Sequence, residues 1–174
     1  MGTSETKINL ENLKAMFLAA HRSFIENHAS LLKRELSERC LCGALMCELN
    51  KQLEKNACNN YYADIEFNRA FENTINNVKH LHDEEGTPKR VFPDIIVHSR
   101  GEVTPGNLLA LEMKKSTARR EAKERDKNRL SLLTSSYPYK YKLGVYYEIN
   151  NKRRQILVEF YQNGKMVEVK ILEL

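Results

Sequence analysis

The sequence predicts a single α/β domain, built on a central mixed β-sheet with flanking helices and a C-terminal β-hairpin. The chain has 174 residues, which fits one domain with one core and leaves little room for two. Apolar residues recur at helical spacing in the first third of the chain and alternate at strand spacing in several later segments. Because an isolated hairpin is marginally stable in water, we expect the helices to cover the sheet.

The first predicted helix covers residues 9–27 and belongs to an N-terminal extension, residues 1–30, of the domain core. Its apolar residues fall on one face, which consists of Leu10, Leu13, Phe17, Ala20 and Phe24. Such a face can pack on the chain's own core, or it can bind a second copy in a homodimer or a partner in a larger complex. We favour packing on the core and keep the partner surface as the alternative.

A second helix is predicted from Ser30, a residue type that caps helices, to about residue 56. Its apolar stripe is formed by Leu41, Cys42, Leu45, Met46, Leu49 and Leu53. Glu38 lies within this stripe, and a buried carboxylate is costly unless it is paired or binds a metal. Glu48 lies roughly 100° from the stripe, where solvent contact is expected, and it is the alternative to Glu38. Gly43 is expected to let the sheet approach the helix closely.

Strand-like alternation begins at residues 61–69, which predict the first strand of the sheet. Residues 70–90 are polar and rich in turn-forming residues, so they predict a long loop with at most a short helix. Val91–His98 and Asn107–Lys114 are apolar runs separated by a loop that contains glycine and proline. We therefore expect these two runs to form a β-hairpin in the middle of the sheet.

The end of the chain, residues 150–174, predicts a second hairpin. The apolar and aromatic segment 143–149 predicts a strand that precedes it. Gln155–Tyr161 and Lys165–Ile171 then flank Asn163-Gly164, the strongest short-range signal for a hairpin turn in the sequence. This hairpin is expected to extend the sheet.

The central hairpin carries the candidate catalytic residues. Side chains alternate along a strand, so Glu112 and Lys114 share one face, and Asp94 lies within cross-strand reach of Glu112. Two carboxylates suit Mg²⁺ or Mn²⁺, which take one or two carboxylates together with water and phosphate oxygens. Lys114 could orient an attacking water, favour its deprotonation or stabilise developing negative charge. The alternative is a hairpin whose polar residues only face solvent.

Three phrases of the sequence resemble the PD-(D/E)XK, or restriction-endonuclease-like, nuclease superfamily, and in particular a group of small bacterial members. They are Glu66-Phe67-Asn68-Arg69, Pro93-Asp94-Ile95-Ile96-Val97-His98 and Asn107-Leu108-Leu109-Ala110-Leu111-Glu112-Met113-Lys114-Lys115. The similarity covers a core of residues 31–149. It implies an α/β fold that cleaves nucleic acid with a divalent metal bound by Asp94 and Glu112, with Glu38 as a third acid. DNA is favoured over RNA as the substrate, although the sequence leaves both open, and the resemblance also implies a role in restriction or anti-phage defence.

A third helix is predicted over residues 116–133, and basic residues outnumber acidic ones in and just before it. Lys115, Arg119, Arg120 and Lys123 are candidates for contacts with substrate phosphates. The alternative is a solvated helix with pairs such as Glu121 with Arg125. Beyond it, tyrosines alternate with lysines, and Tyr139 and Tyr141 could stack on unpaired bases or equally occupy a strand edge.

Composition limits the partners. Lys and Arg number 28 and Asp and Glu 23, so the formal charge of +5 suits a polyanionic partner. No stretch reaches the roughly 20 apolar residues that span a bilayer, so no membrane partner and a cytoplasmic location are expected. Cys40, Cys42, Cys47 and Cys58 lack the spacing of a zinc site and are interpreted as buried reduced thiols.

Two other functions remain open at this point. The chain could be a catalytically silent domain that only binds nucleic acid, although such a domain has no chemical need for all three motif residues. It could also be an interaction subunit of a larger defence or repair complex, docking through its first helix. No Gly-rich G-x-x-x-x-G-K-[ST] loop occurs, so any energy-driven step would need a partner.

Overall fold

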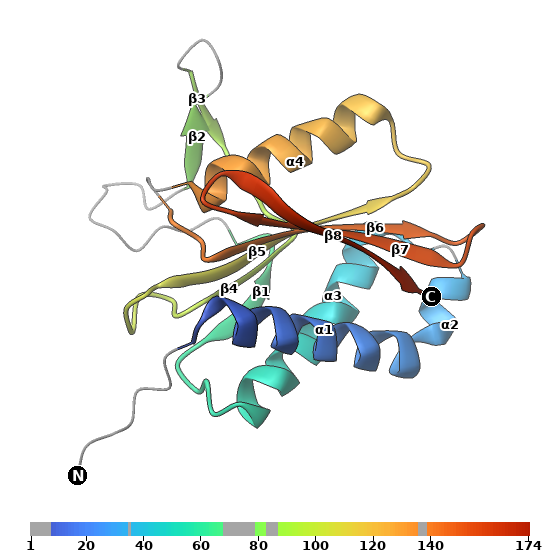
Figure 1. The fold of residues 1–174 in the computed structure, drawn as a ribbon, viewed down its shortest axis with the longest axis horizontal. Helices are drawn as coiled ribbons and strands as arrows, with labels where there is room; N and C mark the ends of the chain where they lie inside the picture. The colour runs from blue at the N-terminus through green and yellow to red at the C-terminus, as the bar shows by residue number, and fades with distance from the viewer. Residues whose placement is uncertain (1–7, 35, 68–78, 83–86, 136–138) are drawn as a thin grey trace.

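The computed structural model describes residues 8–34, 36–67, 79–82, 87–135 and 139–174. Its helices are α1 (Leu10–Asn27), α2 (Ala29–Lys33), α3 (Glu38–Lys55) and α4 (Arg120–Thr134). Its strands are β1 (Tyr62–Ile65), β2 (His80–His82), β3 (Pro88–Arg90), β4 (Ile95–His98), β5 (Asn107–Lys115), β6 (Leu143–Asn150), β7 (Gln155–Gln162) and β8 (Lys165–Glu173). Figure 1 shows α4 on one side of the main sheet and α1 and α3 on the other.

The main sheet has six strands in the order β1-β4-β5-β6-β7-β8. All neighbours are antiparallel except β5 and β6, which are parallel and are joined by the crossover through α4. The sheet is therefore mixed, and the β4–β5 hairpin lies inside it. The predicted C-terminal hairpin is confirmed as β7–β8, where Asn163 and Gly164 both take the positive φ angles, 49° and 78°, that its turn requires.

One face of the sheet packs against α1 and α3 through an apolar core. Asn9 caps α1 by accepting a hydrogen bond from the backbone N–H of Asn12 at 2.8 Å. The predicted apolar face of α1 is buried in this core: Leu13, Phe17 and Phe24 are fully buried. The interpretation of this face as core packing is thus confirmed, and its side chains are not exposed for a partner.

The other face of the sheet packs against α4. Gly144 of β6 makes this close approach possible, because a Cβ at that position would lie 2.9 Å from Cβ of Tyr161 and 3.0 Å from Cγ2 of Thr134. The close approach predicted at Gly43 was wrong, since a Cβ there would meet nothing within 4 Å. The glycine that brings helix and sheet together therefore lies on the strand, under α4.

The predicted second helix is divided in two, with α2 ending before α3 begins. Ser30 lies inside α2 and does not cap the long helix. Ser37 does so instead, its side chain accepting a hydrogen bond from the backbone N–H of Cys40 at 3.3 Å. The boundary was wrong because the chain offers two serines as caps, and the pattern alone did not separate them.

The loop predicted over residues 70–90 was also wrong in its described part, where β2 and β3 form a small antiparallel pair. Residues 68–78 and 83–86 lie outside the described part of the chain, and with them Asn68 and Arg69 of the first resemblance phrase. β1 ends at Ile65, earlier than predicted, because Glu66 takes a positive φ of 49°.

None of the described helices is long and apolar enough to cross a membrane. The four cysteines are free. Cys42 and Cys58 are buried as expected, but Cys40 and Cys47 are exposed. The expectation of burial was wrong for these two because they lie on the solvent side of α3, beside the apolar stripe rather than on it.

Candidate active site

The three motif residues meet near the end of β5. Ile95 of β4 is paired with Leu111 of β5, so continuing this register by one residue brings Asp94 opposite Glu112. The Asp94 carboxylate accepts a hydrogen bond from the backbone N–H of Met113 at 2.7 Å, which fixes the acid against β5. Leu111 and Met113 point into the apolar core, whereas Glu112 lies on the α4 side, as the alternation predicted.

Glu38 joins this group from the first turn of α3. One of its carboxylate oxygens accepts a hydrogen bond from the backbone N–H of Lys115 at 2.9 Å, and the other lies 3.3 Å from Nζ of Lys114. The helical acid predicted beside the hairpin therefore lies there. Within the site, its contacts are with Lys114 and Lys115.

Glu48 has a different role, and its expected contact with solvent was wrong. Its side chain is 1% exposed and accepts hydrogen bonds from Lys51 at 2.8 Å, His28 at 3.0 Å and Asn27 at 3.4 Å. Burial raises the pKa of Glu48, but these hydrogen bonds outweigh it and lower the pKa overall. Glu48 thus ties α3 to the end of α1, away from the candidate site.

Two residues of α4 complete the site, and the sequence interpretation did not assign them to it. Asp126 lies 2.7 Å from Nζ of Lys114, and Arg129 donates a hydrogen bond to Glu112 at 2.8 Å. Asp126 is only 5% exposed. The signal that could have found them is a charged residue on an apolar helical stripe, which also identified Glu38. Both lie within the stripe of α4 that carries Leu130 and Leu133.

The carboxylates of the site are held in an environment that disfavours their charged forms. Burial raises the pKa of Glu112 well above its usual value, the Arg129 guanidinium opposes this, and the charges of Asp94 and Asp126 add to it. Burial also raises the pKa of Asp94, with further contributions from Asp126 and Glu38, against the opposing effects of the Met113 hydrogen bond and Lys114. A cation placed between Asp94 and Glu112 would instead favour the charged forms of both carboxylates and lower their pKa values.

Lys114 is a charged ammonium in this environment. Burial by itself lowers the pKa of Lys114, but Asp126, Glu38 and Asp94 together raise it above its usual value. A lysine with a raised pKa keeps its proton at neutral pH. The roles considered for Lys114, which are orienting a water, favouring its deprotonation and stabilising negative charge, all suit a charged ammonium.

The candidate phosphate-binding cations are not equivalent. Arg119 and Arg120 are exposed at the start of α4. Lys123 instead points to the sheet, where its ammonium donates to Glu148 at 2.9 Å and to the backbone carbonyl of Ser116 at 2.8 Å. Lys115 is half-buried, and its backbone N–H is bound by Glu38.

The candidate stacking tyrosines lie apart from the acids. Tyr141 is 2% exposed and accepts a hydrogen bond from the buried ammonium of Lys79, so its ring faces are covered by the protein. Tyr139 exchanges hydrogen bonds with the backbone of His80, at 2.6 and 2.8 Å. Both residues attach the β2–β3 pair to the body of the domain. The stacking role was wrong for the buried Tyr141, and it stays a prediction for the half-buried Tyr139.

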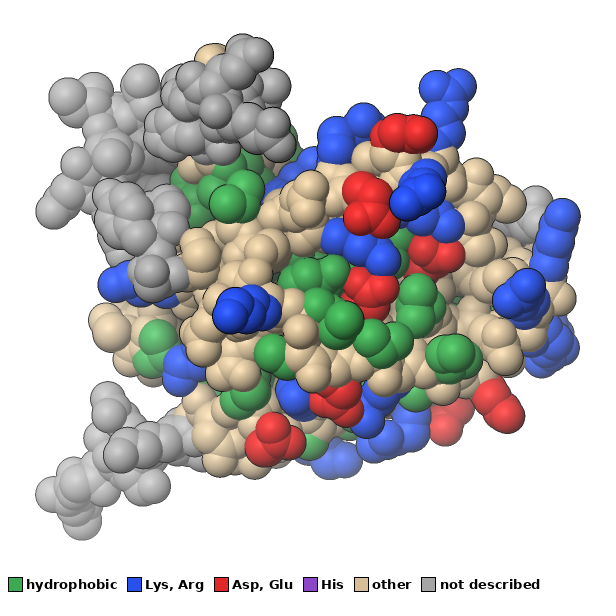
Figure 2. Space-filling model, turned by 45° about the horizontal axis from the view of Figure 1, so that its top comes forward, with side chains coloured by type: hydrophobic (Ala, Val, Ile, Leu, Met, Phe, Trp, Pro, Cys, Tyr) green, Lys and Arg blue, Asp and Glu red, His purple; other side chains and the backbone are tan. Residues whose placement is uncertain are grey.

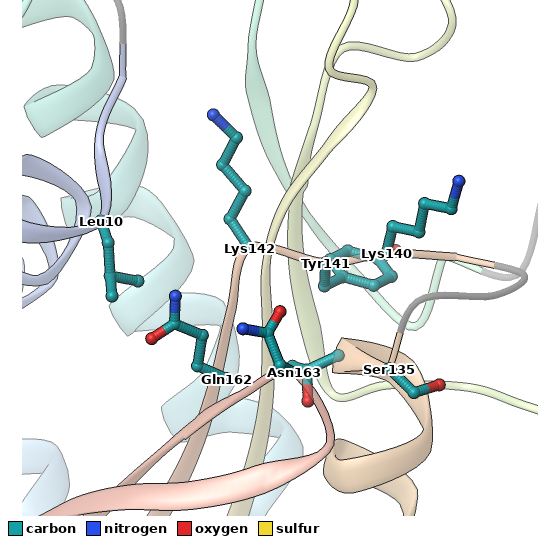
Figure 3. A pocket seen from close by; sticks show the side chains of 8 residues that line it. Leu10, Ser135, Lys140, Tyr141, Lys142, Gln162 and Asn163 are labelled. Carbon is teal, nitrogen blue, oxygen red and sulfur yellow. The ribbon is translucent and has the colours of Figure 1, made fainter.

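A pocket of about 560 Å³ lies at the far end of α4 from Arg120, beside the β7–β8 turn. Figure 3 shows its lining, which includes Leu10, Tyr141, Lys142 and Asn163. Neither the candidate acids nor Lys114 line it. It is therefore a separate feature of the surface.

No group of three or more His, Cys, Asp or Glu side chains that could hold a metal ion occurs among the described residues. Comparison with models of protein families gave no match, and comparison with curated proteins gave none either.

Proposed function

We propose that the chain is a metal-dependent nuclease that hydrolyses phosphodiester bonds, with DNA as the favoured substrate. The observation that carries the proposal is the convergence of Asp94, Glu112 and Lys114 with Glu38 at one end of β5. Asp94 directly precedes β4, Glu112 and Lys114 belong to β5, and Glu38 begins α3. Asp94, Glu112 and Lys114 match the motif that resembles the PD-(D/E)XK superfamily, and Glu38 is the candidate third acid. A cytoplasmic location and a role in restriction or anti-phage defence stay predictions.

The acids fit a hard divalent cation such as Mg²⁺ or Mn²⁺. Oxygen Oε2 of Glu112 is buried and has no hydrogen-bond partner among the described residues, and Asp94, which directly precedes β4, lies opposite Glu112 when the β4–β5 register is continued. Two carboxylates are a sufficient protein contribution, because Mg²⁺ is usually bound by one or two of them together with water and phosphate oxygens. When bound, the metal would activate a water and neutralise charge on the phosphodiester. Glu38, bound to Lys114 and Lys115, would join this pair only by leaving those contacts.

The protein's own contribution is a fixed positive charge. Asp126 and Glu38 hold the Lys114 ammonium from two sides, at 2.7 and 3.3 Å. In this position Lys114 would donate hydrogen bonds to the reacting phosphate or to the attacking water. Because this charge is already in place before the reaction, the protein does not have to reorganise around the transition state as it forms.

A second candidate is a nucleic-acid-binding domain without catalytic activity, and one observation favours it. Arg129 already pairs with Glu112, and Asp126 already pairs with Lys114, so two of the motif residues have ionic partners on α4, as they would in a structural ion-pair network. The Glu112 oxygen without a partner among the described residues favours the nuclease, because the large majority of buried polar atoms in a folded protein are hydrogen-bonded.

The deciding experiment incubates the purified chain with circular single-stranded DNA, plasmid or RNA, each with Mg²⁺, Mn²⁺ or EDTA. Cleavage that requires the metal and disappears in Asp94→Asn and Glu112→Gln supports the nuclease. Glu159→Gln is the matched control, because Glu159 is also a buried carboxylate paired with an α4 cation, Lys127 at 2.7 Å. Binding without cleavage, measured in Ca²⁺ and Mg²⁺ alike, would establish the silent domain.

A further inference from the structure

Strand β8 forms one edge of the main sheet, and in the described part of the chain nothing pairs with its outer side. The backbone N–H of Leu174 donates to the carbonyl of Arg154 at 3.0 Å, so Leu174 is a hydrogen-bonded partner of the strand next to it. Such partners alternate along an antiparallel strand. The backbone groups of Lys170 therefore point to β7, and those of Val169 and Ile171 point outward and are available for another strand.

The same edge exposes apolar side chains. Of the large hydrophobic residues that are exposed in the described chain, four belong to β8: Met166, Val167, Val169 and Ile171, with exposures of 48% to 68%. Edge strands of soluble proteins are usually protected by charges, prolines or a covering element. An apolar edge with free backbone groups is instead typical of a strand that pairs with another chain.

The two faces of β8 are chemically different. Glu168 pairs with Lys14 of α1 at 2.8 Å, and Leu172 packs against the apolar core, so Glu168, Lys170 and Leu172, which follow the bulge in β8, face α1. Val169 and Ile171 consequently lie on the α4 side. Figure 2, which turns the α4 side of the molecule toward the viewer, shows hydrophobic side chains gathered there, surrounded by charged ones.

The sequence of β8 is complementary to its own reversed copy. When KMVEVKILE is read against itself in antiparallel orientation about Val169, apolar residues meet apolar residues and opposite charges meet. The pairs are Val169 with Val169, Glu168 with Lys170, Val167 with Ile171, Met166 with Leu172, and Lys165 with Glu173. Residues directly opposite each other on antiparallel strands interact most strongly. Any other register of two copies would lose this match of charges.

We propose that two copies of the chain associate through antiparallel pairing of their β8 strands about a two-fold axis at Val169, which joins the two sheets into one. The pairing is isologous, so the assembly stops at a dimer, and the β8 edge of each copy is covered by the β8 edge of the other. A bulge in β8 between Met166 and Glu168 interrupts its regular ladder with β7. The regular segment of the contact is thus centred on Glu168, Val169 and Lys170. This proposal is independent of the proposed function.

A second copy is a better occupant of this edge than a strand of an unrelated protein. A foreign strand would have to supply the reversed charge order of β8, whereas a second copy supplies it by symmetry. Glu168 and Lys170 are also adjacent across the same face of one strand, 2.7 Å apart, so each copy presents both charges together. Two opposite-charge pairs then form across the axis.

The test is sedimentation equilibrium of the full chain over a wide concentration range, with variants that reverse one charge. We expect a reversible monomer–dimer equilibrium for the wild type. Glu168→Lys and Lys170→Glu each place like charges opposite each other twice, and each should raise the dissociation constant about tenfold or more. An equimolar mixture of these two variants should recover the dimer, because each chain then meets its opposite charges on the other.

Two further variants separate the β8 contact from general surface effects. Val169→Lys places two ammonium groups at the axis and should yield a monomer, with circular dichroism reporting that the fold is intact. Leu132→Lys is the control, because Leu132 is an exposed apolar residue of α4 with 45% exposure, and it should leave the dimer unchanged. A wild type that stays monomeric at all concentrations, a dimer that Val169→Lys leaves intact, or a mixture that forms no heterodimer overturns the proposal.

Discussion

The two faces of the main sheet are held to their helices by different balances of apolar and ionic contacts. On the α1 and α3 side the contact is apolar, with fully buried residues such as Phe17, Leu45 and Val145. On the α4 side a smaller apolar cluster, which includes Leu130 and Leu133, is accompanied by four ion pairs between helix and strands: Arg129 with Glu112, Lys123 with Glu148, Lys127 with Glu159 and Asp126 with Lys114. Figure 2 shows the charged side chains that collect on this side.

We expect this difference to separate the effects of substitutions on stability from their effects on the candidate site. Burial of apolar surface is the main favourable contribution to folding, whereas buried ion pairs often contribute little because the charges lose their hydration. A helix attached by ion pairs can nevertheless hold charged side chains in defined positions. We therefore expect substitutions on the α1 side to act on stability and those on the α4 side to act on the candidate site.

The largest expected effect is on the apolar side. Phe17→Ala should lower the free energy of unfolding by about 3–5 kcal/mol, because it removes a fully buried ring that contacts Tyr147 and Phe160 edge to face. Urea denaturation followed by circular dichroism measures this. Phe92→Ala is the control, since Phe92 is 49% exposed and its loss should stay within about 0.5 kcal/mol. Similar losses for both variants would contradict the contrast.

The next largest expected effect is a loss of activity caused by a substitution on the α4 side. Asp126→Asn removes the charge that holds Lys114 and, if the chain is a nuclease, should lower kcat about 10- to 100-fold with a small change in stability. Steady-state cleavage assays and urea denaturation measure the two quantities separately. Glu159→Gln, on the same helix–sheet contact, should keep normal kcat. An Asp126→Asn enzyme with normal kcat would leave Asp126 as a structural residue only.

A third prediction asks whether the ion pairs of the α4 side stabilise the fold through mutual neutralisation. Arg129→Met leaves Glu112 buried without its partner and should cost about 1–3 kcal/mol of unfolding free energy. Adding Glu112→Gln should recover most of this loss, because the acid that needed the cation is gone. A double-mutant cycle provides the measurement. Strictly additive effects would mean that the two side chains are not coupled.

The smallest effect is a pH dependence on the apolar side. His21 is buried against Tyr147, and burial, with a contribution from Arg22, lowers its pKa to about 4. The unfolded chain then binds the proton more readily than the fold, so stability is present above the unfolded pKa and is lost as pH falls. We expect a loss of about 1 kcal/mol from this group between about pH 7 and pH 5.5. Denaturation of His21→Gln should lack this part of the pH dependence.

The predictable part of the molecule was the part that depends on local pattern. Alternation placed Glu112 and Leu111 on opposite faces of β5, and Asn163-Gly164 located the last turn, because each follows from backbone geometry within a few residues. The α/β class and the central hairpin followed in the same way. Glu38 was found because an acid on an apolar stripe requires a partner, and the structure contains that partner in Lys114.

The features that could not be predicted from the sequence depend on contacts between distant segments of the chain. Lys123 was predicted to contact substrate phosphates, yet its ammonium points to Glu148, whose position is fixed only when the sheet forms. Glu48 looked solvated because its partners, His28 and Asn27, come from the end of another helix. A single sequence gives the charge of each residue but not the residue that it faces.

Lys114 contacts residues of both α3 and α4, which lie on opposite sides of the sheet. Any ligand that draws its ammonium away would loosen Glu38 and Asp126 at the same moment. The amide of Lys115, protected now by the Glu38 carboxylate, would then exchange its hydrogen with solvent faster. Occupation of the site would in this way be transmitted to both helical layers, and amide exchange at one backbone position would report it.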